Sequence, residues 1–99
     1  MKHKILYIYD FLKIDDSINL LPNLENLNLS GNGLSDEINL DRLLRLTILD
    51  LSNNNIESID NLYVGNISIL NLSQNRIKHL SKLSRLLGKF DKQLWYSNF

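Results

Sequence analysis

The stretch Leu46-Thr-Ile-Leu49-Asp-Leu51-Ser-Asn-Asn54-Asn-Ile56 decides the fold of this chain of 99 residues. Its apolar residues alternate at Leu49 and Leu51, as in a β-strand that buries one of its two faces. Asn54 follows at the point where the chain must turn out of the strand. The stretch therefore predicts a short strand followed by a tight turn.

The same pattern, L-x-x-L-x-L-x-x-N-x-L, occurs three times in the chain. Its copies begin at Leu24, Leu46 and Ile67, so successive copies lie 22 and 21 residues apart. One such strand cannot bury its face alone, whereas about three stacked copies form a continuous core. We therefore expect a single domain over residues 1–99. Its parts are an N-terminal cap (1–23), three repeats (24–45, 46–66 and 67–80) and a C-terminal cap (81–99).

These residues and their spacing resemble the leucine-rich-repeat family, and the resemblance covers about residues 14–83. The period, and the apolar residues spaced by three after Ile56 and Ile77, are similar to the short intracellular subfamily with repeats of ~22 residues. The resemblance implies an α/β solenoid with a parallel sheet on its concave face and short helices or loops on its convex side. It also implies that the concave face binds a protein partner.

An Asn follows each of the three predicted strands, and we interpret these residues as structural. An Asn side chain both donates and accepts hydrogen bonds, so it can bond the buried backbone of its own turn and of the next one. Stacked Asn residues would then form a ladder along the domain. The predicted ladder consists of Asn32, Asn54 and Asn75.

The segments between the strands are expected to return along the convex side. Residues 35–44 are the best helix candidate, because Ser35 is suited to cap a helix and acidic residues fill its first turn. A short helical return is also expected over residues 15–21. Residues 56–63 form a shorter segment, which predicts a 3₁₀-like or irregular return.

The N-terminal residues are rich in β-formers and predict a first strand beside Leu27. Counting back by the repeat places the strand positions at Tyr7 and Tyr9. Counting by alternation also allows Leu6 and Ile8 to point inward. The sequence leaves both registers open.

The C-terminal residues depart from the repeat. After Ile77 the apolar residues fall on one arc of a helix, with basic residues on the opposite side. We interpret residues 81–95 as a capping helix that covers the last repeat. A partial fourth motif is the alternative, but it would place Gln93 at a core position and Leu94 in solvent. The basic residues of the predicted helix are Lys82, Arg85, Lys89 and Lys92.

Function is expected in the side chains that lie between the core Leu positions, because these face outward on the sheet. The adjacent aliphatics Ile48 and Ile69 favour a contact surface, although strand propensity or a covering loop would also account for them. A polar column beside them either binds a peptide or is solvated. The Ser column after it (Ser30, Ser52 and Ser73) is interpreted as local hydrogen bonding. The predicted partner-binding residues are Asn26, Asn28, Ile48, Asp50, Ile69 and Asn71.

Charge leaves one alternative function open. The chain has 11 basic and 11 acidic residues, so its net charge does not point to nucleic acid or to a membrane surface. The charges are unevenly placed, however, because residues 76–99 contain six basic residues and one acidic residue. The alternative is therefore binding of nucleic acid or an anionic surface through the basic C-terminal helix.

The sequence contains no constellation of residues typical of catalysis. There is no cysteine, and His3 and His79 are isolated from other metal-ligand types. We therefore expect no enzymatic activity, no metal and no cofactor. The absence of cysteine favours a cytoplasmic or nuclear location. No apolar run approaches the ~20 residues of a membrane span, and we expect a monomer or a weak edge-to-edge dimer.

Overall fold

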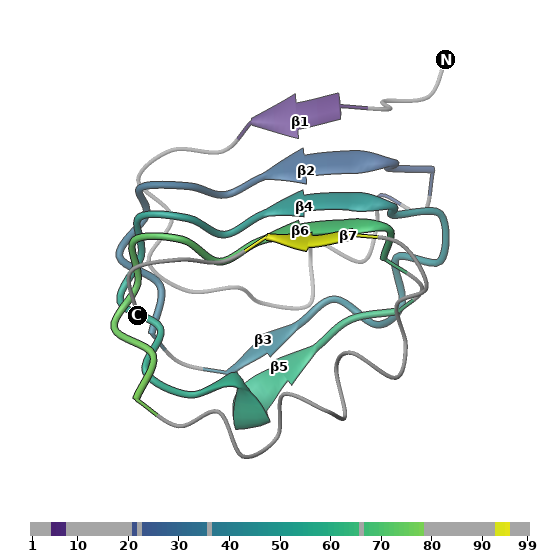
Figure 1. Ribbon diagram of the computed structural model, residues 1–99. Coiled ribbons are helices and arrows are strands. Elements are labelled where there is room, and N and C mark those ends of the chain that lie inside the picture. The colour runs from purple at the N-terminus through teal and green to yellow at the C-terminus, as the bar shows by residue number, and fades with distance from the viewer. Residues whose placement is uncertain are drawn as a thin grey trace.

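The computed structural model describes residues 5–7, 21, 23–35, 37–65, 67–78 and 93–95. In this part of the chain, five strands form a parallel sheet in the order β1-β2-β4-β6-β7, and β3 and β5 form a second, small parallel sheet. The two sheets lie on opposite sides of the molecule (Figure 1). The strands are β1 (Ile5–Tyr7), β2 (Asn26–Asn28), β3 (Ile38–Asn39), β4 (Ile48–Asp50), β5 (Leu62–Tyr63), β6 (Ile69–Asn71) and β7 (Gln93–Trp95).

The repeat period places equivalent residues of β2, β4 and β6 side by side. Leu27 pairs with Leu49, which pairs in turn with Leu70. All three side chains are fully buried, while the residues on either side of each are only partly buried. The ladder continues past the strands, since the Leu29 N–H donates to the Asp50 carbonyl at 2.9 Å. The alternation predicted from the sequence is therefore present in each of these three strands.

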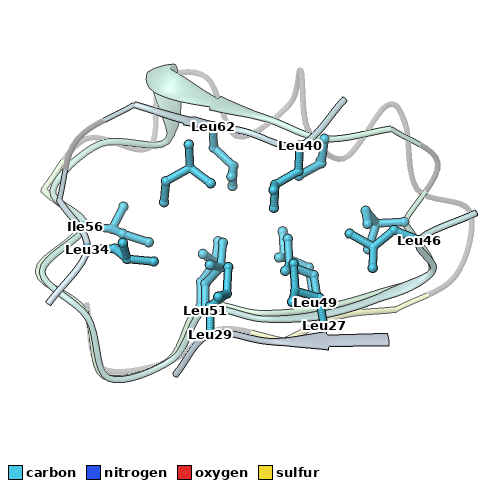
Figure 2. Packing of buried hydrophobic residues seen from close by; sticks show 14 of the residues in the cluster. Leu27, Leu29, Leu34, Leu40, Leu46, Leu49, Leu51, Ile56 and Leu62 are labelled. Atoms are coloured by element: carbon cyan, nitrogen blue, oxygen red, sulfur yellow. The ribbon is translucent and has the colours of Figure 1, made fainter. Parts of the chain in front are cut away.

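The core lies between the two sheets. Leu29 stacks on Leu51 on the side of the five-stranded sheet, and both face Leu40 and Leu62 across the interior (Figure 2). Burying one such side chain stabilises the fold by roughly 1.5–3 kcal/mol. The buried apolar residues are Leu24, Leu27, Leu29, Leu34, Ile38, Leu40, Leu43, Leu46, Leu49, Leu51, Ile56, Ile59, Leu62, Val64, Ile67, Leu70, Leu72 and Ile77.

The return segment of the first repeat is not helical in the part that is described, so the prediction of a helix over residues 35–44 is wrong. The segment instead contains β3, followed by turns at residues 41–42 and 44–45. Ile38 and Leu40 are buried on either side of the exposed Asn39, which is the alternation of a strand. Pairing of Ile38 with Leu62 of β5 then supplies backbone partners that a helix would have supplied internally.

The return segment of the second repeat contains a 3₁₀ helix, η2 (Ile59–Asn61), which confirms the expected 3₁₀-like return. Ser58 caps this helix, because its side chain accepts a hydrogen bond from the Asp60 N–H at 3.1 Å. Ile59 is buried in the core. β5 follows directly, so this return combines one helical turn with one short strand.

At the N-terminal end, β1 pairs in parallel with β2, which confirms the expected first strand. Its register places Leu6 beside Leu27 and Tyr7 beside Asn28. Leu6 therefore holds the position equivalent to the core Leu, as counting by alternation allows. The expected return over residues 15–21 lies outside the described residues, apart from Leu21.

At the C-terminal end, β7 pairs in parallel with β6, so the prediction of a helix that continues to Trp95 is wrong. Leu94 pairs with the buried Leu70, whereas the partial fourth motif would have placed Gln93 at that position. Leu94 fits both the register position equivalent to Leu70 in a strand of three residues and the apolar stripe of a helix. The spacing of the apolar residues could not distinguish a helix from a strand at residues 93–95. The rest of the predicted helix, residues 81–92, lies outside the described residues.

Candidate binding face of the sheet

The six residues predicted to bind a partner lie together on the side of the five-stranded sheet that faces away from the core. We call this surface the outer sheet face. All six side chains are partly buried. The register arranges them in two rows that cross β2, β4 and β6. The aliphatic row is Asn26, Ile48 and Ile69, and the polar row is Asn28, Asp50 and Asn71.

Two of the three members of the aliphatic row carry aliphatic side chains. Ile48 and Ile69 are register partners on adjacent strands, and adjacent strands lie about 4.8 Å apart. The two side chains therefore form one continuous strip. The same register position is occupied by Asn26 in β2 and by Gln93 in β7.

Each residue of the polar row is held by the Ser that follows two positions later. Asn28 Oδ1 accepts hydrogen bonds from the Ser30 N–H at 3.0 Å and from the Ser30 hydroxyl at 2.8 Å. Asp50 Oδ1 accepts the same pair from Ser52, at 2.9 and 2.6 Å. The third copy is Asn71 Oδ1 with Ser73, at 3.0 and 2.7 Å.

From the sequence, the polar column and the Ser column were interpreted separately, and the bonds between them were not predicted. The signal for this pairing is an Asn or Asp two residues before a Ser at a strand end, a spacing typical of side-chain-to-backbone turns. A backbone N–H can only donate, so the atom that faces it must be an oxygen. This fixes the orientation of both amides. Among the described residues, no hydrogen bond or ion pair reaches the remaining head-group atoms: Asn28 Nδ2, Asp50 Oδ2 and Asn71 Nδ2.

The Asn residues that follow the strands lie inside the fold, away from this surface. Asn54 Nδ2 donates to the carbonyls of Leu29 at 3.1 Å and Leu51 at 2.9 Å, in two neighbouring repeats. Asn54 Oδ1 accepts hydrogen bonds from the backbone N–H groups of Asn32 and Leu34, at 3.0 and 2.9 Å. Bridges of this kind join each turn to the next. Asn32, Asn54 and Asn75 are all buried.

Two further properties of the described residues concern other kinds of site. No group of three or more His, Cys, Asp or Glu residues within them is placed to hold a metal ion. No helix in the same part of the chain has the length and hydrophobicity needed to cross a membrane.

Comparison with known proteins identifies the class. Residues 23–42 and 45–67 match the Leucine Rich Repeat family model, which covers the first two repeats with β2, β3, β4 and β5. Neither the curated proteins nor the solved structures yielded a significant match. These matches cover less than half of the chain and support leucine-rich repeats in this part of it, and the parallel strands fit a fold of the leucine-rich-repeat type. Proteins of this family are generally non-enzymatic modules that bind other proteins.

Proposed function

We propose that this chain is an intracellular protein-interaction module that binds its partner through the outer sheet face. The observation that carries the proposal is the strip formed by Ile48 and Ile69 in two central strands of the sheet. Apolar area that a partner removes from water contributes roughly 25 cal/mol per Å². Residues near the centre of an interface typically supply most of the binding free energy.

Strand formation alone does not require aliphatic residues at these positions. Asn26 and Gln93 occupy the same register position in β2 and β7, and both strands pair in the sheet. The sheet therefore accommodates an amide side chain in this row. This supports a binding role for Ile48 and Ile69 over the alternative that they serve only as β-formers.

The return segments offer a weaker candidate. Leu44 is 80% exposed, between the exposed Arg42 and Arg45. Single exposed aliphatic residues are ordinary on protein surfaces, and within the described residues Tyr63 is the other large apolar residue that is exposed. It therefore provides a matched control for experiments on Ile48 and Ile69.

The experiment compares wild type with the double variant Ile48→Gln/Ile69→Gln. Partners are captured from native extract, identified by mass spectrometry, and their affinities measured by calorimetry with purified proteins. Loss of the strip should weaken binding at least about tenfold, since 1.4 kcal/mol corresponds to that factor. Leu44→Gln should leave the affinity unchanged, and urea unfolding checks that both variants fold. An unchanged affinity for the folded double variant would overturn the proposal.

The alternative function, binding of nucleic acid or an anionic surface through a basic C-terminal helix, is not supported by the described part of the chain. Residues 93–95 form β7 where that helix was expected to end. Its basic residues, at positions 82–92, lie outside the described residues.

A further inference from the structure

We propose that the polar row of the outer sheet face binds a basic side chain, Lys or Arg, of an extended peptide segment that carries an aliphatic residue two positions away. The inference rests on the proposed function and names the chemistry of its partner. Its geometric basis is the pattern of hydrogen-bonding atoms that the Ser turns leave available on Asn28, Asp50 and Asn71.

The Ser turns give the polar row a defined order of donors and acceptors. In each residue Oδ1 already accepts two hydrogen bonds from the following Ser. The remaining atoms are a donor on Asn28, an acceptor on Asp50 and a donor on Asn71. Adjacent strands are about 4.8 Å apart, so the row spans about 10 Å across the sheet.

The central group of this row carries a charge. Asp50 is the only ionisable residue in the two rows. By contrast, Glu57, which is exposed and lies outside the rows, already has the Lys78 ammonium group 4.0 Å from its carboxylate. The two hydrogen bonds from Ser52 hold the Asp50 carboxylate in one orientation. Hydrogen bonds between a carboxylate and a cationic donor are shorter and about twice as strong as neutral ones. A Lys or Arg side chain is therefore the best match for Asp50 Oδ2.

The groups around Asp50 favour a peptide as the source of that cation. The amides of Asn28 and Asn71 can donate to peptide carbonyls on either side of the basic residue. Ile48 and Ile69 lie two residues earlier on their strands, or about 6.6 Å from the polar row. An aliphatic residue two positions from the basic one would point to the same face of the extended segment and cover this strip. An anionic ligand would face the Asp50 carboxylate and is disfavoured.

The fold itself supplies variants that change charge and preserve structure. Asn28 and Asn71 show that an amide makes the same Ser turn as Asp50. Asp50→Asn should therefore remove the charge and keep the turn. Asn71→Asp is the matched opposite, because Asp50 shows that a carboxylate is accommodated in this row. Urea unfolding of both variants checks that the fold is retained.

The probe is a phage-displayed library of random linear peptides, selected on the wild-type chain. Enriched peptides should contain Lys or Arg two positions from an aliphatic residue. Asp50→Asn should weaken their binding at least about tenfold, as expected for a lost charge-assisted hydrogen bond. It should also remove the fall of affinity with added salt. Asn71→Asp should strengthen binding of peptides that contain two basic residues.

Three outcomes would overturn the inference, and they separate it from the proposed function. If Asp50→Asn binds the selected peptides as well as wild type while Ile48→Gln/Ile69→Gln does not, the basic partner is wrong and the binding face stands. If the enriched peptides lack basic residues but their binding needs the Ile strip, the basic partner is again wrong and the binding face stands. If neither variant changes binding, or nothing is enriched on wild type over the double variant, both proposals fail.

Discussion

The sheet side and the return side of the repeats differ in how regular they are. On the sheet side, Asn28, Asp50 and Asn71 each make the same pair of hydrogen bonds to the following Ser. On the return side, the first repeat has β3 followed by two turns, whereas the second has η2 followed by β5. The same chain is thus strictly repetitive on one side and variable on the other.

The difference shows which interactions impose regularity. Buried backbone N–H and C=O groups must find hydrogen-bond partners, and these bonds have direction and length. On the sheet side the partners come from the neighbouring repeat, so every repeat must have the same geometry. On the return side β3 and β5 also pair, but the rest of each return segment is held mainly by apolar contact with the core, which two different backbone paths provide.

The largest loss of stability is expected for a variant of the Asn ladder, which tests whether the ladder causes the regularity of the sheet side. Asn54→Ala removes the donor to the Leu29 and Leu51 carbonyls and the acceptor of two backbone N–H groups. Each buried polar group left without a partner costs roughly 1–3 kcal/mol, and we therefore expect the free energy of unfolding, measured with urea, to fall by on the order of 4 kcal/mol.

The neighbouring Asn55 is the matched control, because it is exposed. Asn55→Ala should change the free energy of unfolding by no more than about 0.5 kcal/mol. If the two variants lose similar stability, the ladder is not what makes the sheet side regular.

A smaller effect is expected on the return side, where apolar contact is the main requirement. Leu43 is 1% exposed and its neighbour Leu44 is 80% exposed. Leu43→Ala should destabilise the fold by about 2–3 kcal/mol, near the lower end of the range for buried Leu, because a path without an Asn ladder can relax around the cavity. Leu44→Ala should cost less than about 0.5 kcal/mol. Thermal unfolding of both variants checks this, and a loss at Leu43 as large as that at Asn54 would contradict the comparison.

The same difference accounts for what could be predicted from the sequence. Leu49, Leu51 and Asn54 predicted the strands and the turns, because few structures other than a stacked strand and turn combine alternation and a terminal Asn at a fixed period. The first return was predicted incorrectly, because Ile38 and Leu40 alternate like a strand while Leu43 follows at helical spacing. Local periodicity does not distinguish these structures, and pairing with β5 decides between them.

The candidate site was predicted in position but not in chemistry. The sequence placed Ile48, Ile69 and the polar row on one face, as their register shows. It did not predict that Asp50 bonds to Ser52, because that bond depends on how the backbone bends after β4. The orientation of the outward atoms follows from this bond. Sequence periodicity alone therefore could not reveal the order of donors and acceptors.

The smallest loss of stability is expected for substitutions of Gly31, which test whether the turn after each strand accepts different residues without a change in geometry. Gly31, Asn53 and Gln74 occupy the same place after their strands, with left-handed φ values of 72°, 57° and 58°. An ideal Cβ on Gly31 would meet no atom within 4 Å, so a substitution there is opposed by backbone strain and not by a clash. Gly31→Ala should lower the free energy of unfolding by about 1 kcal/mol.

Gly31→Asn should cost about half as much in the same urea titration, since Asn is tolerated in the left-handed region and Asn53 already adopts it at this position. Equal losses for the Ala and Asn variants would show that the turn does not impose the left-handed backbone on its residue. A loss of several kcal/mol for either would mean that Gly31 is needed for close packing, in conflict with the open space around it. The expected order, wild type above Asn above Ala, instead makes the turn geometry the fixed feature of each repeat and the residue that adopts it the variable one.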